Sequence, residues 1–262
     1  MAVKALILRT AGTNCDEETD FAFRMAGAET QKLHVNVLRE DPDRLLDFHV
    51  LAIPGGFSYG DDLGAGTVLA NELLTLLRPA LEGFVESGRL VIGICNGFQV
   101  LVKTGLLPGI NRWEQQSTLT INDSHKFEDR WTYLKAPRSR CVLVEDHERI
   151  YLPVAHAEGK FVPADGVLEQ LRNNGQIVFR YTDSDGNTDP GYPDNPNGSV
   201  EDIAGVCDPS GRVLGLMPHP ERHSLPIHHP RWTREGLKPK GDGMALFERA
   251  VQFVQEHPPS TV

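Results

Sequence analysis

The sequence predicts an α/β fold with a mostly parallel central sheet and an antiparallel extension. Up to Gly105, short β-branched apolar runs alternate with segments of helical periodicity, which is typical of parallel strands joined by right-handed crossovers. From Thr118 onward, strand-like runs follow one another with turns between them, which indicates antiparallel pairing. With 262 residues, 40% of them hydrophobic, the chain can bury the core of a large domain. Because no segment reads as a linker, we expect a single domain over residues 1–262.

The N-terminal half is predicted to supply the parallel strands. Strands are expected at 3–8, 31–35, 50–53 and 90–94, and helices at 17–26, 63–77, 79–87 and between Cys95 and Gly105. Gly27 is expected to end the first helix in a left-handed cap. Residues 54–62 read Pro-Gly-Gly-Phe-Ser-Tyr-Gly-Asp-Asp, a composition that argues against a helix and predicts a loop.

The C-terminal half is predicted to form the extension. Strands are expected at 118–122, 131–134, 141–144, 151–156, 176–181, 203–207 and 213–217, and helices at 167–172 and 244–255. The last two strands should form a hairpin around the turn at 208–211. Residues 183–199, dense in Asp, Asn, Gly and Pro, predict a long surface loop.

Composition and charge exclude several classes of function. A formal net charge of -10 without clusters of Lys and Arg argues against a nucleic-acid partner. No apolar run has the length of a membrane-spanning helix, and the chain starts on a strand-like segment, so we expect neither a membrane span nor a targeting segment. The four cysteines lack C-x-x-C spacing, which predicts free thiols in a reducing, cytoplasmic setting and no structural zinc site.

Cys95 lies where the strand at 90–94 must turn directly into a helix. Gly93 and Gly97 flank it in a G-x-C-x-G pattern, which resembles the nucleophile elbow of hydrolases. The N-terminal amides of the following helix would favour the thiolate and could hold an oxyanion. A buried core cysteine with glycines nearby by chance is the other interpretation of this local pattern.

Two further segments follow strands and would reach the same edge of a parallel sheet. Gly55 and Gly56 let the backbone approach a ligand closely, and an amide there could pair with one near Asn96 to form an oxyanion hole. A simple glycine turn is the alternative. His219 and Glu221 stand two residues apart, so an extended backbone directs both side chains to one side. An ordinary turn is the alternative for this pair.

Together these three signals predict acyl transfer on a cysteine. A histidine can take the thiol proton and return it to a leaving amine, while a carboxylate orients the ring, which makes Cys95, His219 and Glu221 a candidate triad.

Cys15 is a rival nucleophile, because it also follows a strand and precedes a helix. It lacks glycines in the elbow register, and we expect it to lie in a loop beside the site.

The motifs resemble those of a known family. Residues 54–56, 93–97 and 219–221 resemble the signatures of class I glutamine amidotransferases. Segments 12–16, 55–61, 93–99, 156–159, 195–199 and 217–222 resemble the glutaminase subunits of phosphoribosylformylglycinamidine synthases over nearly the whole chain. The resemblance implies a flavodoxin-like three-layer sandwich, and it gives His156 and Glu158 a role in the active site or at an interface rather than as metal ligands.

The resemblance also implies a reaction and a partner. Cys95 would form a γ-glutamyl thioester from L-glutamine, His219 would protonate the ammonia, and Glu221 would orient His219. The implied oxyanion and substrate-binding residues are Gly55, Gly56, Phe57, Asn96 and Gln99. Ammonia would pass to a synthetase large subunit, with or without a small accessory subunit. That partner would use ATP and Mg, because this chain has no G-x-x-x-x-G-K-[ST] loop, and we expect no cofactor or metal on this chain.

Other interpretations of the chain stay open at this level. A stand-alone cysteine hydrolase or peptidase of the same architecture fits the same triad, and a non-catalytic scaffold subunit is a third possibility that the intact triad argues against. Residues 183–192 and 223–240 are longer than expected for compact members of the family. They would either pack on the synthetase or form surface insertions.

Overall fold

The computed structural model describes residues 1–146 and 148–259 and confirms the predicted α/β fold. A nine-stranded sheet runs in the order β2-β1-β3-β4-β11-β10-β9-β6-β7, and a two-stranded sheet pairs β5 with β8. The parallel part contains β2 (Glu29–His34), β1 (Lys4–Arg9), β3 (Val50–Ile53), β4 (Leu90–Ile94) and β11 (Val213–Leu216). The antiparallel part contains β10 (Ile203–Cys207), β9 (Ile177–Thr182), β6 (Glu128–Lys135) and β7 (Arg149–His156). The small sheet contains β5 (Ser117–Ile121) and β8 (Glu158–Pro163).

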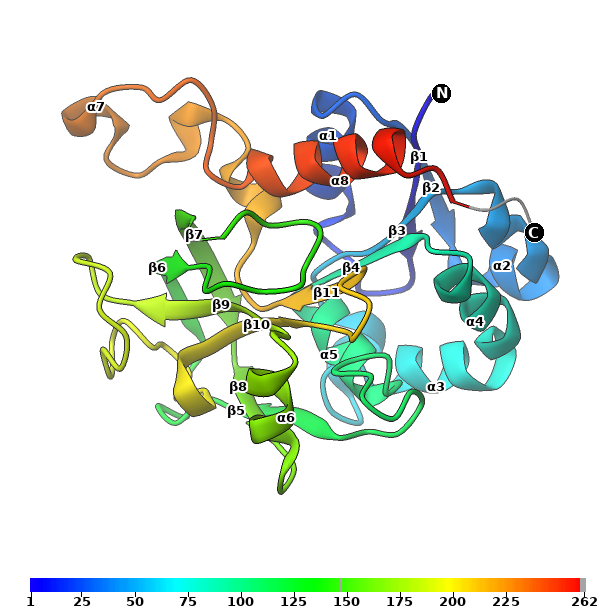
Figure 1. Ribbon diagram of the computed structural model, residues 1–262, viewed down its shortest axis with the longest axis horizontal. Helices are drawn as coiled ribbons and strands as arrows, with labels where there is room; N and C mark the ends of the chain where they lie inside the picture. The colour runs from blue at the N-terminus through cyan, green and yellow to red at the C-terminus, as the bar shows by residue number, and fades with distance from the viewer. Residues whose placement is uncertain (147, 260–262) are drawn as a thin grey trace.

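Helices cover both faces of the parallel part, which gives three layers (Figure 1). On one face α1 (Asp16–Met25) packs against α8 (Met244–Glu256), where the rings of Phe23 and Phe247 meet edge to face with centroids 5.0 Å apart. On the other lie α3 (Thr67–Leu76), α4 (Arg78–Glu86) and α5 (Asn96–Lys103). The remaining helices are α2 (Val35–Glu40), α6 (Val167–Asn173) and α7 (Trp232–Glu235). Short 3-10 segments are η1 (Pro42–Asp47), η2 (Ser58–Asp61), η3 (Val200–Asp202), η4 (Pro220–His223) and η5 (Pro226–His228).

The central strands are apolar because helices cover both of their faces. Every residue of β3, β4 and β11 is buried, as expected for parallel strands in the middle of a covered sheet. At the edge, β2 is polar at every position except Leu33, which is also its only buried residue. Because β3, β4 and β11 are parallel neighbours, their carboxyl ends lie at the same edge of the sheet. These ends lead into the loop at 54–62, the turn at Cys95 and the segment that contains His219 and Glu221, respectively.

Several expectations about individual elements were wrong. Residues 141–144 form turns instead of a strand, because Cys141 and Leu143 are buried against the core while the Val142 amide bonds to a turn at Gly211. The helix expected from residue 63 begins only at Thr67, after glycines with positive φ. Within the loop at 54–62, a 3-10 turn forms at Ser58–Asp61. The elements α2 and β8 were not predicted.

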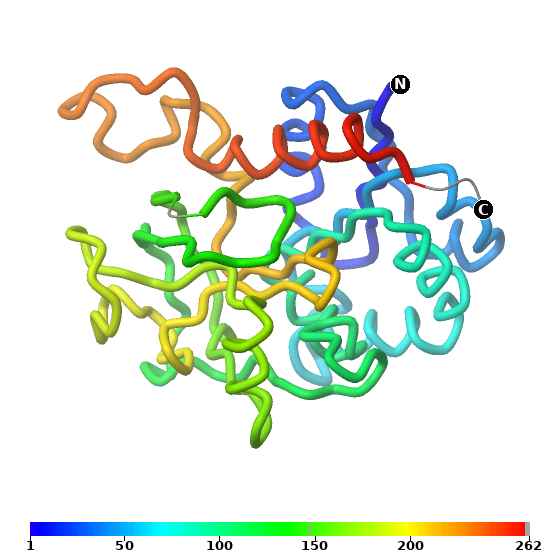
Figure 2. The backbone as a smooth tube through the Cα atoms, viewed as in Figure 1, coloured from blue at the N-terminus to red at the C-terminus, as the bar shows by residue number. Residues whose placement is uncertain are grey.

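The two long segments lie at the end of the molecule formed by the antiparallel extension, away from the N-terminus (Figure 2). Residues 183–199, all of them described, contain no helix or strand, as predicted. Residues 223–240 contain η5 and α7. Within the ranges 1–146 and 148–259, no helix is both long enough and apolar enough to cross a membrane.

Candidate active site

The predicted turn at Cys95 is confirmed. Cys95 joins β4 to α5 with φ 52° and ψ -105°, a strained conformation for a residue with a side chain. Its neighbours must be small: a Cβ on Gly93 would stand 2.6 Å from the Gly97 carbonyl oxygen, and one on Gly97 would stand 2.7 Å from the Ile53 carbonyl carbon. The backbone contacts that force this turn leave the thiol at the start of a helix.

The loop after β3 lies beside this thiol. Gly56 pairs with Thr13 in an isolated antiparallel bridge, which holds the loop against the segment that follows β1. A Cβ on Gly55 would stand 2.8 Å from Cε1 of His219 and 3.4 Å from Cβ of Cys95. Gly55 therefore leaves open the space in which the imidazole and the cysteine converge.

His219 and Glu221 form a buried pair at the end of β11. The distance from His219 Nδ1 to Glu221 Oε1 is 2.6 Å, and each residue is 1% exposed. Burial works against the charged ring, but the Glu221 carboxylate and the Cys95 thiol outweigh it and raise the pKa of His219 well above its ordinary value. With Nδ1 engaged, His219 Nε2 has no hydrogen-bond partner among the described residues and is left for the cysteine.

Two backbone amides next to the thiol are free to hold an oxyanion. Gly56 N donates to no acceptor in the described part of the chain, and Asn96 N is an orphan donor in the first turn of α5. Phe57 N instead donates to the Gly12 carbonyl at 2.9 Å. Phe57 can therefore contribute only its half-exposed side chain to the site.

The side chains of Asn96 and Gln99 connect the walls of the site. Asn96 Nδ2 donates to Asp61 Oδ1 at 3.1 Å and to Gln99 Oε1 at 2.9 Å, while its Oδ1 accepts from Ser58 N at 3.1 Å. Gln99 Nε2 donates to the Glu158 carbonyl at 2.6 Å. Of the predicted substrate-binding residues, these two therefore have side chains already engaged by the protein.

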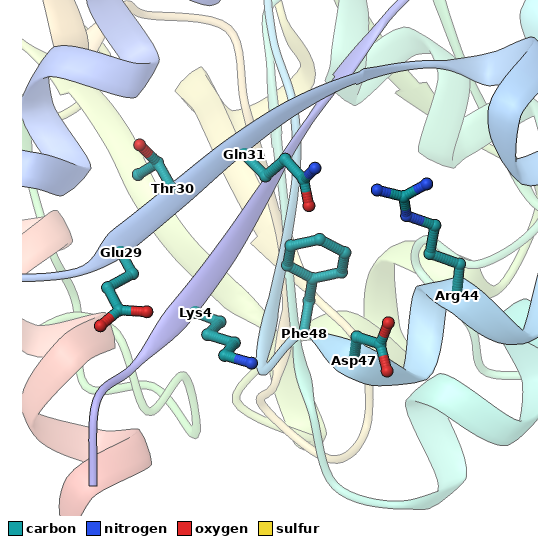
Figure 3. A pocket seen from close by; sticks show the side chains of 7 residues that line it. All are labelled: Lys4, Glu29, Thr30, Gln31, Arg44, Asp47 and Phe48. Carbon is teal, nitrogen blue, oxygen red and sulfur yellow. The ribbon is translucent and has the colours of Figure 1, made fainter.

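A cleft of about 50 Å³ opens above Cys95. Its lining residues are Gly56, Phe57, Asp61, Ala65, Cys95, Gln99, Ala155, His156, Ala157 and Glu158. Asp61 and the alanines were not among the predicted site residues, although Asp61 and Ala157 lie within the family-like segments 55–61 and 156–159. A separate cavity of about 370 Å³ lies at the amino ends of β1 and β2, around Lys4, Arg44 and Phe48 (Figure 3). None of the predicted site residues lines this second cavity.

Cys15 lies beside the site, as predicted. Its sulfur is 4.0 Å from His219 Nδ1 and receives a hydrogen bond from Arg222 Nη2 at 3.1 Å. Candidate metal-ligating atoms of Cys15, His219 and Glu221 lie within 4.8 Å of one another. The Arg222 guanidinium against the sulfur opposes a metal cation there.

His156 is buried behind the cleft without a charged partner. Its Nδ1 is 3.2 Å from Asn122 Oδ1 and its Nε2 is 3.5 Å from Asn197 Nδ2, which donates to the Tyr181 hydroxyl. Burial, with a smaller contribution from His219, lowers the pKa of His156 to about 3. The ring therefore stays neutral in the folded protein at neutral pH.

This burial predicts a loss of stability in acid. Between the ordinary histidine pKa and about 3, His156 binds a proton when unfolded but not when folded, so stability falls as the pH falls. We expect His156→Gln to remove up to about 1.4 kcal/mol per pH unit from the slope of unfolding free energy between pH 6 and pH 4. Urea denaturation across that range measures it. The exposed His125→Gln should keep the wild-type slope, and an unchanged slope in His156→Gln would contradict the assignment.

Cys95 has a strained backbone, and beside it lie the His219–Glu221 pair and two amides that have no acceptor among the described residues. This arrangement is suited to acyl transfer. Comparison with known proteins defines the class of protein. Residues 2–254 match the family model of the CobB/CobQ-like glutamine amidotransferase domain. The chain is therefore a glutamine amidotransferase.

Nearer relatives define the family within this class. The chain is 53% identical to phosphoribosylformylglycinamidine synthase subunit PurQ of Dehalococcoides mccartyi, over 97% of this chain and 98% of the relative. Identity to the subunit of the same name from Methanococcus maripaludis is 41%, over 95% and 97%. A solved structure of PurLQS from Thermotoga maritima matches with a TM-score of 0.74 and 31% identity, over 97% and 100%. The chain belongs to the PurQ family.

Proposed function

We propose that this chain is the glutaminase subunit of a phosphoribosylformylglycinamidine synthase, with Cys95, His219 and Glu221 as its catalytic residues. The observation that carries the proposal is the convergence of Cys95 and the buried His219–Glu221 pair on the space above Gly55, next to an open cleft. We further propose that residues 1–262 act as one domain, since the family model spans 2–254. A cytoplasmic location is in keeping with the four free cysteines.

In this reaction the Cys95 thiolate attacks the side-chain amide carbon of glutamine. The amides of Gly56 and Asn96 receive the charge that develops on the carbonyl oxygen. His219 Nε2 gives its proton to the departing nitrogen, which leaves as ammonia. The γ-glutamyl group stays bound to Cys95 as a thioester. His219 then takes a proton from water as that water attacks the thioester, which releases glutamate and restores the thiol. Glu221 keeps the ring in the tautomer that points Nε2 at the sulfur.

The acceptor chemistry belongs to a partner. Ammonia released into water is protonated and lost as a nucleophile, so its release must be coupled to a protected path. The sequence contains no phosphate-binding G-x-x-x-x-G-K-[ST] loop, so the ATP and Mg are assigned to a synthetase large subunit. That subunit would convert formylglycinamide ribonucleotide to formylglycinamidine ribonucleotide in purine synthesis. The match to PurLQS supports a complex with this large subunit and a small accessory subunit.

A diazo ketone analogue of glutamine tests the nucleophile directly. We expect it to alkylate Cys95, with loss of N2, ahead of Cys15, Cys141 and Cys207, because only Cys95 lines the cleft. Peptide mass spectrometry locates the adduct, and excess glutamine should protect against it. Preferential labelling of Cys15 would overturn the assignment. Adding the synthetase distinguishes a coupled glutaminase subunit from a stand-alone hydrolase. The glutaminase rate should rise for a coupled subunit and stay unchanged for a stand-alone hydrolase.

A further inference from the structure

Cys15 is a buried thiol at the start of α1 that does not cap this helix. It occupies the N-cap position, where Ser, Thr, Asp and Asn normally bond to the free amides of the first turn, but its side chain makes no capping hydrogen bond. It is fully buried, yet it is not part of the hydrophobic core cluster. Neither the helix nor the core therefore explains its position, and its sulfur is directed toward the candidate active site.

The sulfur of Cys15 contacts the segment that carries the proposed His219–Glu221 pair. Arg222 Nη2 donates a hydrogen bond to this sulfur at 3.1 Å, and His219 Nδ1 lies 4.0 Å from it. Among the described residues, the Arg222 guanidinium makes no ion pair with a carboxylate and no second hydrogen bond. A guanidinium has five donors, and its strongest partners are carboxylates. A half-buried guanidinium whose one bond goes to a sulfur therefore indicates that Cys15 is its anchor.

The backbone of Cys15 is fixed to the loop that carries the proposed oxyanion amide. The amides of Asn14 and Cys15 both donate to the Gly55 carbonyl, at 3.3 and 3.2 Å. The sulfur also packs on this loop, because a Cβ on Gly55 would stand 3.1 Å from it. The Cys15 thiol donates to Asn14 Oδ1 at 3.2 Å, which holds the sulfur itself in place. One residue thus joins the loop after β3 to the segment after β11.

The His219–Glu221 pair has no other polar tie to these loops. In the described part of the chain, both polar contacts that join residues 219–222 to the loops after β1 and β3 end on the Cys15 sulfur. The Glu221 carboxylate makes one hydrogen bond, to His219, and its Oε2 has no partner there. The carboxylate therefore orients the ring without anchoring the pair to the rest of the site. The contact between Arg222 and Cys15 supplies that anchor.

Resting on the proposed glutaminase function, we propose that Cys15 and Arg222 are positioning residues of the active site. Together they hold the His219 ring in line with Cys95. Neither of them lines the cleft, so neither should touch glutamine. A ring held in line can exchange its proton with the sulfur and with the departing nitrogen, whereas a displaced ring slows both steps. The link should therefore act on kcat and leave KM unchanged.

Cys15→Ser is the first test, in the reconstituted complex with the synthetase. The hydroxyl has a shorter reach than the thiol, and it can turn to cap the free amides of α1 instead of meeting Arg222. We expect kcat of the glutaminase reaction to fall roughly 10-fold with KM unchanged, while the midpoint of urea denaturation stays at or above the wild-type value. A residue that acted only on stability would lower the midpoint together with kcat. Cys141→Ala, outside the cleft, should keep the wild-type kcat.

Arg222→Met is the second test, because it removes the donors and keeps an unbranched side chain. Its kcat should fall by a similar factor. The double variant Cys15→Ser/Arg222→Met should lose no more than either single variant, since each change breaks the same link. Two independent losses would instead multiply to roughly 100-fold. Arg234→Met changes an exposed arginine of α7 and should keep the wild-type kcat.

Further readouts separate this inference from the proposed function. Synthesis from ammonium salts should stay at the wild-type rate in these variants, and the diazo ketone should still label Cys95. A wild-type kcat in both single variants would overturn the positioning role. So would losses that multiply in the double variant, or a fall in kcat that accompanies a lower midpoint. The assignment of Cys95 would stand in each of these cases, because it fails only if the diazo ketone labels another residue.

Discussion

Replacing Cys95 by alanine is expected to abolish glutamine-dependent synthesis in the reconstituted complex while sparing synthesis from added ammonium salts. Among the described residues, Cys95 is the only cysteine that lines the cleft, so its loss should lower the glutamine-dependent rate by about 10⁴-fold or more. Ammonium salts supply the nucleophile directly to the synthetase, whose active site is on another chain. Measuring both rates in one preparation makes the comparison internal.

Cys141→Ala provides a matched control for this loss. Cys141 is a buried cysteine outside the cleft, and its truncation should keep both the glutamine-dependent and the ammonium-dependent rates. Loss of both rates in Cys95→Ala would contradict the division of labour between the two subunits. A retained glutamine-dependent rate would show that another group is the nucleophile.

Gly97→Ala is expected to prevent stable folding. The added methyl group would overlap the carbonyl oxygen of Ile53 and stand 2.7 Å from its carbonyl carbon, so β3 would have to move away from α5. A clash against backbone in the centre of the sheet should cost about 3 kcal/mol or more, a large part of the stability of an ordinary domain. The yield of folded protein and the midpoint of urea denaturation measure the effect.

Gly83→Ala is the matched control for this substitution. Gly83 lies within α4, and a Cβ there would meet no atom within 4 Å. Alanine is the better helix former, so stability should rise by about 0.5–1 kcal/mol. A Gly97→Ala variant with the wild-type midpoint would mean that the contact between β3 and α5 can relax at little cost.

Much of this architecture was predictable because the decisive signals are local. The apolar run of β4 and the glycines around Cys95 occur within a few residues, so a strand, a sharp turn and a helix could be inferred together. The hairpin of β10 and β11 was signalled by its turn. The convergence of His219 on Cys95 followed from the rule that parallel strands end at one edge.

The rest could not be predicted because it depends on contacts between distant residues. Asp61 lines the cleft because its backbone adopts a left-handed conformation and because Asn96 holds its carboxylate, neither of which leaves a pattern in the sequence. The Phe57 amide is unavailable because it bonds to Gly12, on another loop. The apolar run at 141–144 had the composition of a strand, but its residues fill the core from turns.

The position of β11 links enzymatic competence to completion of the chain. β11 comes from residues 213–216, yet it lies between β4 and β10 in the middle of the sheet. In a nascent polypeptide whose residues 213–219 have not yet been synthesised, one side of β4 is unpaired. Such a polypeptide also lacks His219, so Cys95 has no histidine partner. We therefore expect unfinished molecules on the ribosome to be inert toward glutamine, so that nitrogen is not wasted before a synthetase can receive it.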